Sequence, residues 1–200
     1  MPQESGSRQR MIEATIDLMR RSGLTGAGIN EIVRASGAPK GSVYHFFPGG
    51  KQQIASEALM AYSRRVLEFI EAALGSRRSA SAKVTALFAA FARRVEEGEF
   101  RKSCPAGTVC LDLDPELESL RTVVANAFDS WTHLIAHHFT DGDRRDAESF
   151  AGLLLTAIEG AYIRARAERS SRPFKEAGTW LAKLAASRYE VELASKRRRR

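Results

Sequence analysis

The sequence predicts an all-α protein of about nine helices, with a three-helix head at the N-terminus and a longer helical part after it. Apolar residues recur at spacings of three and four along most of the chain, which is typical of amphipathic helices. Glycine, proline and aspartate separate these stretches, and few stretches alternate as strands do. The 200 residues, 44% of them hydrophobic, are enough for one or two domains with a core.

The head is expected to occupy residues 1–50. Its first helix should run over about residues 7–22 and bury an apolar face before Gly23 ends it. Two short helices should follow, because Gly37 favours the left-handed conformation that ends a helix and Pro39 pushes the preceding residue out of the helical region. Two short helices joined by such a turn are typical of a DNA-reading helix-turn-helix.

The second of these short helices, from Lys40 to about Phe47, should pack inward through Val43 and Phe47. Its remaining side chains can donate hydrogen bonds, and a glycine there lets a phosphate approach the backbone. Asn30 is expected to accept N–H bonds in the opening turn of the preceding helix, and Lys51 to favour an anion at the start of the next one. The predicted DNA-binding residues are Asn30, Lys40, Gly41, Ser42, Tyr44, His45 and Lys51.

The stretch K-G-S-V-Y-H-F-F resembles the recognition-helix signature of the TetR family of bacterial transcriptional repressors, K-G-x-[LV]-Y-x-[HY]-F. The flanking G-x-G-I-N-E-I and F-P-G-G-K are similar to its LmrA/YxaF-like subgroup, which includes regulators of multidrug-resistance and flavonoid-responsive genes. His45 and Phe46 depart from the residues frequent in the family, which bears on the bases that are read. The resemblance implies a homodimer that represses from a palindromic operator and is released by a small-molecule effector.

The rest of the chain, residues 51–195, predicts a ligand-binding and dimerisation domain. Proline, glycine and aspartate signals predict helices over 50–74, about 82–98, a short stretch from Pro105, about 114–138, 144–168 and 173–189. Small residues on the last two helices permit close approach of a second subunit. The predicted dimerisation residues are Leu154, Ile158, Ala161, Ala165, Ala177, Leu181 and Leu184.

Aromatic residues on the helices of this domain are candidates for contact with a small aromatic or cationic effector, although aromatic residues at helical spacing also form ordinary cores. Glu159 interrupts an apolar run, so it is either a carboxylate for a polar or cationic ligand or a partner for nearby arginines. The predicted ligand-binding residues are Tyr62, Phe69, Phe88, Phe91, Phe128, Trp131, Glu159 and Tyr162.

The formal net charge of +7 is unevenly distributed. Residues 1–51 carry seven Lys/Arg against four Asp/Glu, and residues 196–200 are all basic and expected to be a disordered tail. A constitutive nucleic-acid-binding protein without an effector is therefore an alternative. Neither a membrane-length apolar run nor a secretory pattern is present, so a cytoplasmic protein without membrane contact is expected.

Two weaker alternatives rest on Cys, His and Asp residues. Cys104 and Cys110 match no zinc spacing and are expected to be reduced thiols, with redox sensing as the other possibility. Asp129, His133 and His137 could share a helix face as metal ligands, but such a polar stripe is ordinary for an amphipathic helix. With no phosphate-binding loop and no nucleophile motif, the sequence predicts a protein that is not an enzyme and has no cofactor or metal.

Overall fold

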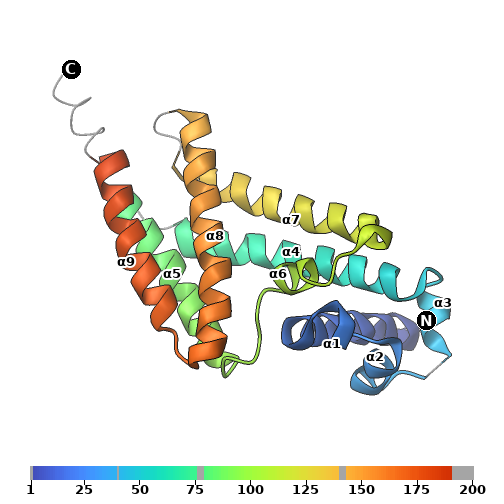
Figure 1. Cartoon of the computed structure of the whole chain (residues 1–200). Coiled ribbons are helices and arrows are strands. Elements are labelled where there is room, and N and C mark those ends of the chain that lie inside the picture. Colours follow the sequence, from blue (N-terminus) through green and yellow to red (C-terminus); the bar gives the residue numbers. More distant parts are fainter. Residues whose placement is uncertain (1, 40, 76–78, 140–142, 191–200) are drawn as a thin grey trace. The chain divides into compact units, whose positions relative to one another are not determined.

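The structure is a computed structural model that describes residues 2–39, 41–75, 79–139 and 143–190. Within these ranges the chain is helical and contains no strand, so the all-α prediction is confirmed (Figure 1). The α-helices are α1 (Pro2–Gly26), α2 (Ile29–Ser36), α3 (Ser42–Phe46), α4 (Gly50–Leu74), α5 (Ala80–Glu97), α6 (Pro105–Cys110), α7 (Glu118–His137), α8 (Arg144–Glu168) and α9 (Arg172–Ala185). A 3₁₀ turn, η1 (Pro115–Leu117), precedes α7, and a π-helical turn, η2 (Ala186–Glu190), follows α9.

The chain divides into two compact units. Unit 1 comprises Met1–Arg65 and Lys102–Phe128, and unit 2 comprises Val66–Arg101 and Asp129–Arg200. The helices α4 and α7 each contribute residues to both units. The division by function into 1–50 and 51–195 stays a prediction, and the basic tail at 196–200 lies outside the described residues.

Unit 1 is built on α1, whose helical path breaks at Gly23 (φ 68°, ψ −169°) before a final turn to Gly26. The predicted end at Gly23 therefore marks the break rather than the last helical residue. Met11 and Met19 of α1 are fully buried, as are Ile32 of α2 and Ile54 of α4. Burial of these apolar side chains is the main force that holds the short helices α2 and α3, which are too short to be stable alone.

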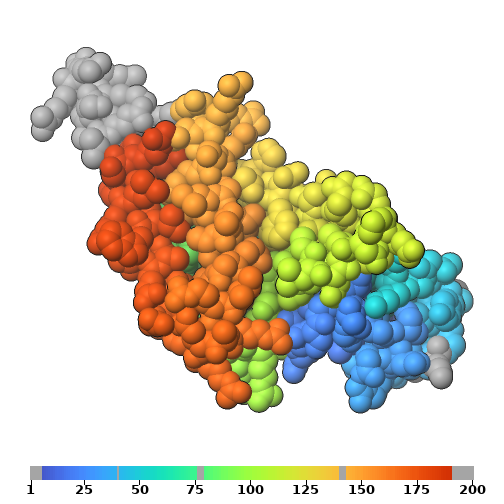
Figure 2. Space-filling model, in the orientation of Figure 1, coloured from blue at the N-terminus to red at the C-terminus, as the bar shows by residue number. Residues whose placement is uncertain are grey.

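Unit 2 has its core between α5, α8 and α9. Phe88 of α5, Ile158 of α8 and Phe174 of α9 are each at most 1% exposed. The Asp143 side chain accepts a hydrogen bond from the Arg145 N–H at the start of α8, and Ser79 does the same for Ala82 at the start of α5. The space-filling view shows α8 (orange) and α9 (red) with their side chains meeting along one continuous surface (Figure 2).

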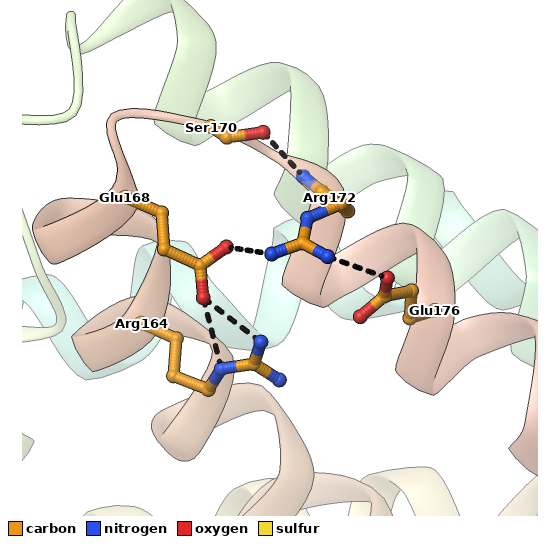
Figure 3. A network of polar contacts seen from close by, with 5 residues as sticks. All are labelled: Arg164, Glu168, Ser170, Arg172 and Glu176. Carbon is orange, nitrogen blue, oxygen red and sulfur yellow. Dashed lines mark hydrogen bonds and ion pairs between the residues drawn. The ribbon is translucent and has the colours of Figure 1, made fainter.

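The corner between α8 and α9 carries an exposed network of charged side chains (Figure 3). Glu168 accepts hydrogen bonds from Arg164 and Arg172, and Arg172 also pairs with Glu176. The backbone N–H of Arg172 donates to the Ser170 hydroxyl at 3.1 Å. Solvent-exposed ion pairs each contribute little to the free energy of unfolding, so this network adds little to the stability of the fold.

The chain after α9 returns to the start of α5. The helix predicted to reach Tyr189 ends at Ala185 and widens into η2, where Glu190 accepts hydrogen bonds from the Ser81 N–H (2.8 Å) and hydroxyl (2.7 Å). These bonds lower the pKa of the Glu190 carboxyl, with the backbone bond as the largest cause. Among the described residues, no helix combines the length and apolar character needed to cross a membrane.

Candidate nucleic-acid interface

The first helix of the helix-turn-helix, α2, begins at Ile29. Gly28 is the N-cap residue, with extended backbone (φ −68°, ψ 153°) and no side-chain cap. Asn30 is therefore the second helical residue, where it is exposed to solvent rather than capping the helix as expected. The helix ends as predicted, because Gly37 adopts the left-handed conformation (φ 62°, ψ 20°).

The second helix, α3, runs from Ser42 to Phe46, so it begins two residues later than predicted. Val43 and Phe47 are fully buried, whereas Tyr44 is 63% exposed and His45 is also exposed. Ser42 is half-buried at the first helical position. Two buried apolar side chains thus hold a short helix whose polar side chains face solvent. Lys40 lies outside the described residues.

A network of side chains from α1 and α4 fixes the end of α3. The Arg8 guanidinium lies 5.0 Å from the centre of the Phe47 ring and pairs with Glu57. Glu57 also accepts a hydrogen bond from Gln53 Nε2 (3.0 Å), and Gln53 Oε1 accepts one from the Gly49 N–H (2.8 Å). Sequence reasoning missed this network, in which only the four-residue spacing of Gln53 and Glu57 was visible as a signal.

A second link between α1 and α4 joins Glu13 to Arg65. Arg65 Nη1 donates to Glu13 Oε2 at 2.8 Å, and Arg65 Nη2 donates to the other carboxylate oxygen. The Arg65 hydrogen bonds hold the pKa of the Glu13 carboxyl below its usual value. This bidentate pair and the Arg8–Glu57 pair connect α1 and α4 at two separate points. The two connections restrict movement of α1 relative to the first turns of α4.

Two glycines border the exposed face of α3. Gly50 has φ 61°, and a Cβ atom there would lie 3.5 Å from Cε1 of Tyr44, so the Tyr44 ring rests beside the turn that starts α4. Gly41 has an ordinary backbone conformation (φ −73°, ψ −14°), and, apart from its two chain neighbours, no heavy atom of the described residues lies within 4 Å of the position of a Cβ. Lys51 is half-buried in the first turn of α4. This face therefore combines open backbone with hydroxyl, phenol and imidazole groups.

Comparison with known families agrees with this geometry. Residues 11–58 match the family described as bacterial regulatory proteins, tetR family, and residues 80–179 match the C-terminal domain described as transcriptional regulator LmrA/YxaF-like. An uncharacterised HTH-type transcriptional regulator of Mycobacterium tuberculosis is 33% identical over 175 residues, covering 84% of this chain and 88% of that protein. The chain belongs to the TetR family of bacterial transcriptional regulators.

Two further proteins show the same similarity over most of their length. The transcriptional regulator LmrA of Bacillus subtilis is 25% identical, covering 84% of this chain and 90% of that protein. A TetR transcriptional regulator from Chloroflexus aurantiacus has the same fold, with a TM-score of 0.79, 25% identity and coverage of 94% of this chain and 98% of that one. The protein is thus a DNA-binding regulator rather than an enzyme.

The α2–turn–α3 unit is therefore a TetR-family helix-turn-helix. Tyr44 and His45 of the predicted DNA-binding set share the exposed side of α3, with Gly41 directly before the helix and Lys51 after the next turn. No His, Cys, Asp or Glu cluster of three or more that could hold a metal ion occurs in the described ranges. In particular, His133 Nδ1 lies 2.7 Å from the backbone oxygen of Asp129.

Three of the predicted ligand-binding residues meet in one aromatic cluster of unit 2. The ring centres of Phe69 and Phe91 are 5.0 Å apart, and those of Phe91 and Tyr162 are 6.0 Å apart. Phe174, which the sequence analysis did not single out, lies 5.2 Å from Tyr162 and 6.4 Å from Phe91. The Arg94 guanidinium covers Phe69 at 4.9 Å from its ring centre. The cluster joins four helices, α4, α5, α8 and α9.

The other predicted ligand-binding residues are distributed between the two units. Phe88 and Trp131 are buried in unit 2, where Glu159 is half-buried on α8. Tyr62 and Phe128 belong to unit 1, and the Arg20 guanidinium lies 5.7 Å from the Tyr62 ring centre. The eight residues therefore do not form a single cluster within either unit.

The predicted dimerisation residues on α8 and those on α9 differ in their exposure to solvent. Leu154, Ile158, Ala161 and Ala165 are at most 4% exposed in a single chain, so they pack inside their own subunit and are not presented to a second copy. On α9, Ala177 and Leu181 are half-buried and Leu184 is 44% exposed. The large apolar side chains open to solvent on these helices are Leu153, Ile163, Trp180 and Leu184.

Proposed function

We propose that this protein is a dimeric repressor that binds a palindromic operator in the cytoplasm and is released from it by a small-molecule effector. DNA binding is supported by the structure of α3. This short helix is anchored by the buried side chains of Val43 and Phe47 and exposes Tyr44 and His45 to solvent. Such side chains can donate hydrogen bonds to phosphates and to base edges in the major groove. Gly41, with open space in front of its backbone, suits a phosphate that approaches closely.

The proposed dimer is supported by the exposed face of α8 and α9. Leu153 and Ile163 are 46% and 66% exposed on α8, and Trp180 is 69% exposed on α9. Gly152 and Gly160 lie on α8 with open space where a Cβ would be, which suits close approach of another helix. A two-fold dimer places two α3 helices on half-sites about 34 Å apart, or a multiple of that distance, and so predicts a palindromic operator.

The proposed effector response is supported by the aromatic cluster, because it connects α4 with α5, α8 and α9. Phe69 is half-buried, and Arg94 covers its ring. A small aromatic molecule that separates these rings would move residues of α4, the helix that also begins directly after the DNA-reading turn. An effector acts in this way only if it binds the DNA-incompetent state more tightly.

The first experiment selects DNA from a random pool with the purified full chain at physiological salt. Repeated selection should converge on one palindrome, and excess random DNA should not displace it. A pool that stays random, together with binding that falls steeply as salt rises, would support constitutive binding to phosphates instead.

The proposed release from DNA by an effector is tested with a panel of small aromatic and cationic molecules. A compound that raises the melting temperature of the protein should also release it from the selected DNA, because both effects arise from binding the same state. Compounds that stabilise the protein and leave the DNA complex intact would contradict release by an effector.

A further inference from the structure

The C-terminal end of α1 is held by residues 102–112, a segment that follows it by about eighty positions in the chain. The Ser103 N–H donates to the Arg20 carbonyl oxygen at 2.8 Å, and Arg20 Nε donates back to the Ser103 oxygen at 3.2 Å. The Thr108 hydroxyl donates to the Met19 carbonyl oxygen at 2.8 Å. Met19 and Arg20 lie just before the break at Gly23, so the 102–112 segment bonds to α1 at carbonyls that precede the interruption of its helical path.

The same segment also contacts the far side of the break at Gly23. Asp112 Oδ2 accepts a hydrogen bond from the Thr25 N–H at 2.9 Å. It can do so only beside a glycine, because a Cβ at residue 23 would lie 2.6 Å from this oxygen. Lys102 Nζ adds an ion pair with Asp17 at 2.5 Å. Contacts on both sides of Gly23 therefore fix the path of α1 through its break.

The other half of α1 holds the DNA-reading elements. Arg10 Nε donates to the Ser36 carbonyl oxygen at the end of α2 (3.2 Å), and Arg8 covers Phe47 after α3. A helix transmits a change of direction along its length, because each turn is bonded to the next. The orientation of α2 and α3 thus depends on what is bound to the C-terminal end of α1.

We propose that the 102–112 segment positions the helix-turn-helix for DNA, and that Thr108 and Asp112 are its principal positioning residues. They act through α1 and lie on neither α2 nor α3. A head held in one orientation loses less conformational freedom when it binds, so releasing α1 weakens specific binding. The number of phosphates contacted by the head is unchanged, so the salt dependence of binding is retained.

The test compares Asp112→Ala with the matched control Asp114→Ala in the full chain. Each removes a carboxylate that accepts one backbone N–H at 2.9 Å, but the Asp114 carboxylate accepts it from Glu116, two residues further along the chain, and the Asp112 carboxylate from Thr25 of α1. Asp112→Ala should lose three- to tenfold in affinity for the selected operator, keep the wild-type salt slope and exchange amide hydrogens faster over residues 19–26. Asp114→Ala should match wild type in all three.

A second pair keeps the test decisive if Asp112→Ala proves misfolded by rapid exchange throughout α9. Thr108→Val removes the hydroxyl that reaches Met19, and Thr122→Val removes one that reaches only Glu118 of its own helix (3.1 Å). The expected results are those of the first pair. A folded Thr108→Val or Asp112→Ala variant that binds the operator as tightly as wild type overturns the proposal. An equal loss of operator affinity in a variant and its control also overturns it. So does a variant whose binding depends less steeply on salt than that of wild type.

Discussion

Gly178 of α9 lies directly against Phe88 of α5, and a Cβ atom at position 178 would be 2.6 Å from the Phe88 Cβ and 3.0 Å from its Cγ. Glycine inside a helix costs about 0.5–1 kcal/mol relative to alanine. In α9 that cost is offset because α5 and α9 can approach closely, which completes the burial of Phe88. The main packing contact of unit 2 therefore depends on the absence of a methyl group.

Gly178→Ala should lower the free energy of unfolding by about 1–3 kcal/mol, because the added methyl overpacks the contact with Phe88. Urea unfolding followed by circular dichroism measures the change. Gly6→Ala is the control, because among the described side chains its Cβ would meet Arg10 at an ordinary 3.5 Å. This substitution should be neutral or slightly stabilising. Equal stability of Gly178→Ala and wild type would contradict the packing.

Tyr44→Ala should weaken binding to the selected operator at least tenfold, or by about 1.4–3 kcal/mol, because the exposed phenol is part of the proposed DNA-facing surface. Stability should change little, since the side chain is 63% exposed. Met60→Ala, which removes a 45% exposed side chain from α4, is the matched control. Fluorescence anisotropy with labelled operator measures both, and operator affinity unchanged by Tyr44→Ala would refute the assignment of α3.

Ile163→Glu should convert the proposed dimer to a monomer of 22.1 kDa, because it buries a carboxylate in the apolar face of α8 and α9. Trp180→Glu should act in the same way from α9. Leu111→Glu replaces a side chain that is even more exposed (82%) but lies on the loop after α6, so it should leave the dimer intact. Sedimentation velocity distinguishes these outcomes, and a dimer in all three variants would place the interface elsewhere.

Tyr189 should make stability depend on alkaline pH. Burial, helped by the Asp146 carboxylate, raises the pKa of Tyr189 from 10.0 to about 12. Because the folded value is the higher one, this contribution is complete below pH 10 and is lost as pH rises through about 12. Solvent screening of this partly buried group reduces the full effect of the raised pKa, so between pH 9 and pH 12 wild type should lose about 1–2 kcal/mol more than Tyr189→Phe. Urea unfolding at each pH measures this difference. If wild type and Tyr189→Phe lose the same free energy of unfolding over this range, Tyr189 does not titrate in this way.

Local signals in the sequence were sufficient to predict the boundaries of two long helices. The helices α4 and α8 begin and end at the predicted residues, because a glycine turn precedes the first and Asp143 caps the second. The recognition helix was visible for a similar reason, since the turn at Gly37 precedes it and its inward side chains, Val43 and Phe47, lie four residues apart.

The faces of α8 could not be assigned in the same way. This helix has apolar residues both inside and outside, with Leu154 fully buried and its neighbour Leu153 46% exposed. Periodicity alone does not say which face meets its own chain. The contact between α1 and the 102–112 segment was also invisible, because it joins residues far apart in the sequence through backbone atoms of Met19 and Arg20.

The central claim is that two copies of α3 read one operator, and hydroxyl-radical footprinting on the selected DNA tests it most directly. The account predicts two protected patches related by two-fold symmetry, with centres separated by one helical turn of about 34 Å or a multiple of it. It also predicts that Tyr44→Ala removes both patches at a concentration at which wild type protects them. A single unsymmetrical patch, or protection spread evenly along the DNA, would contradict it.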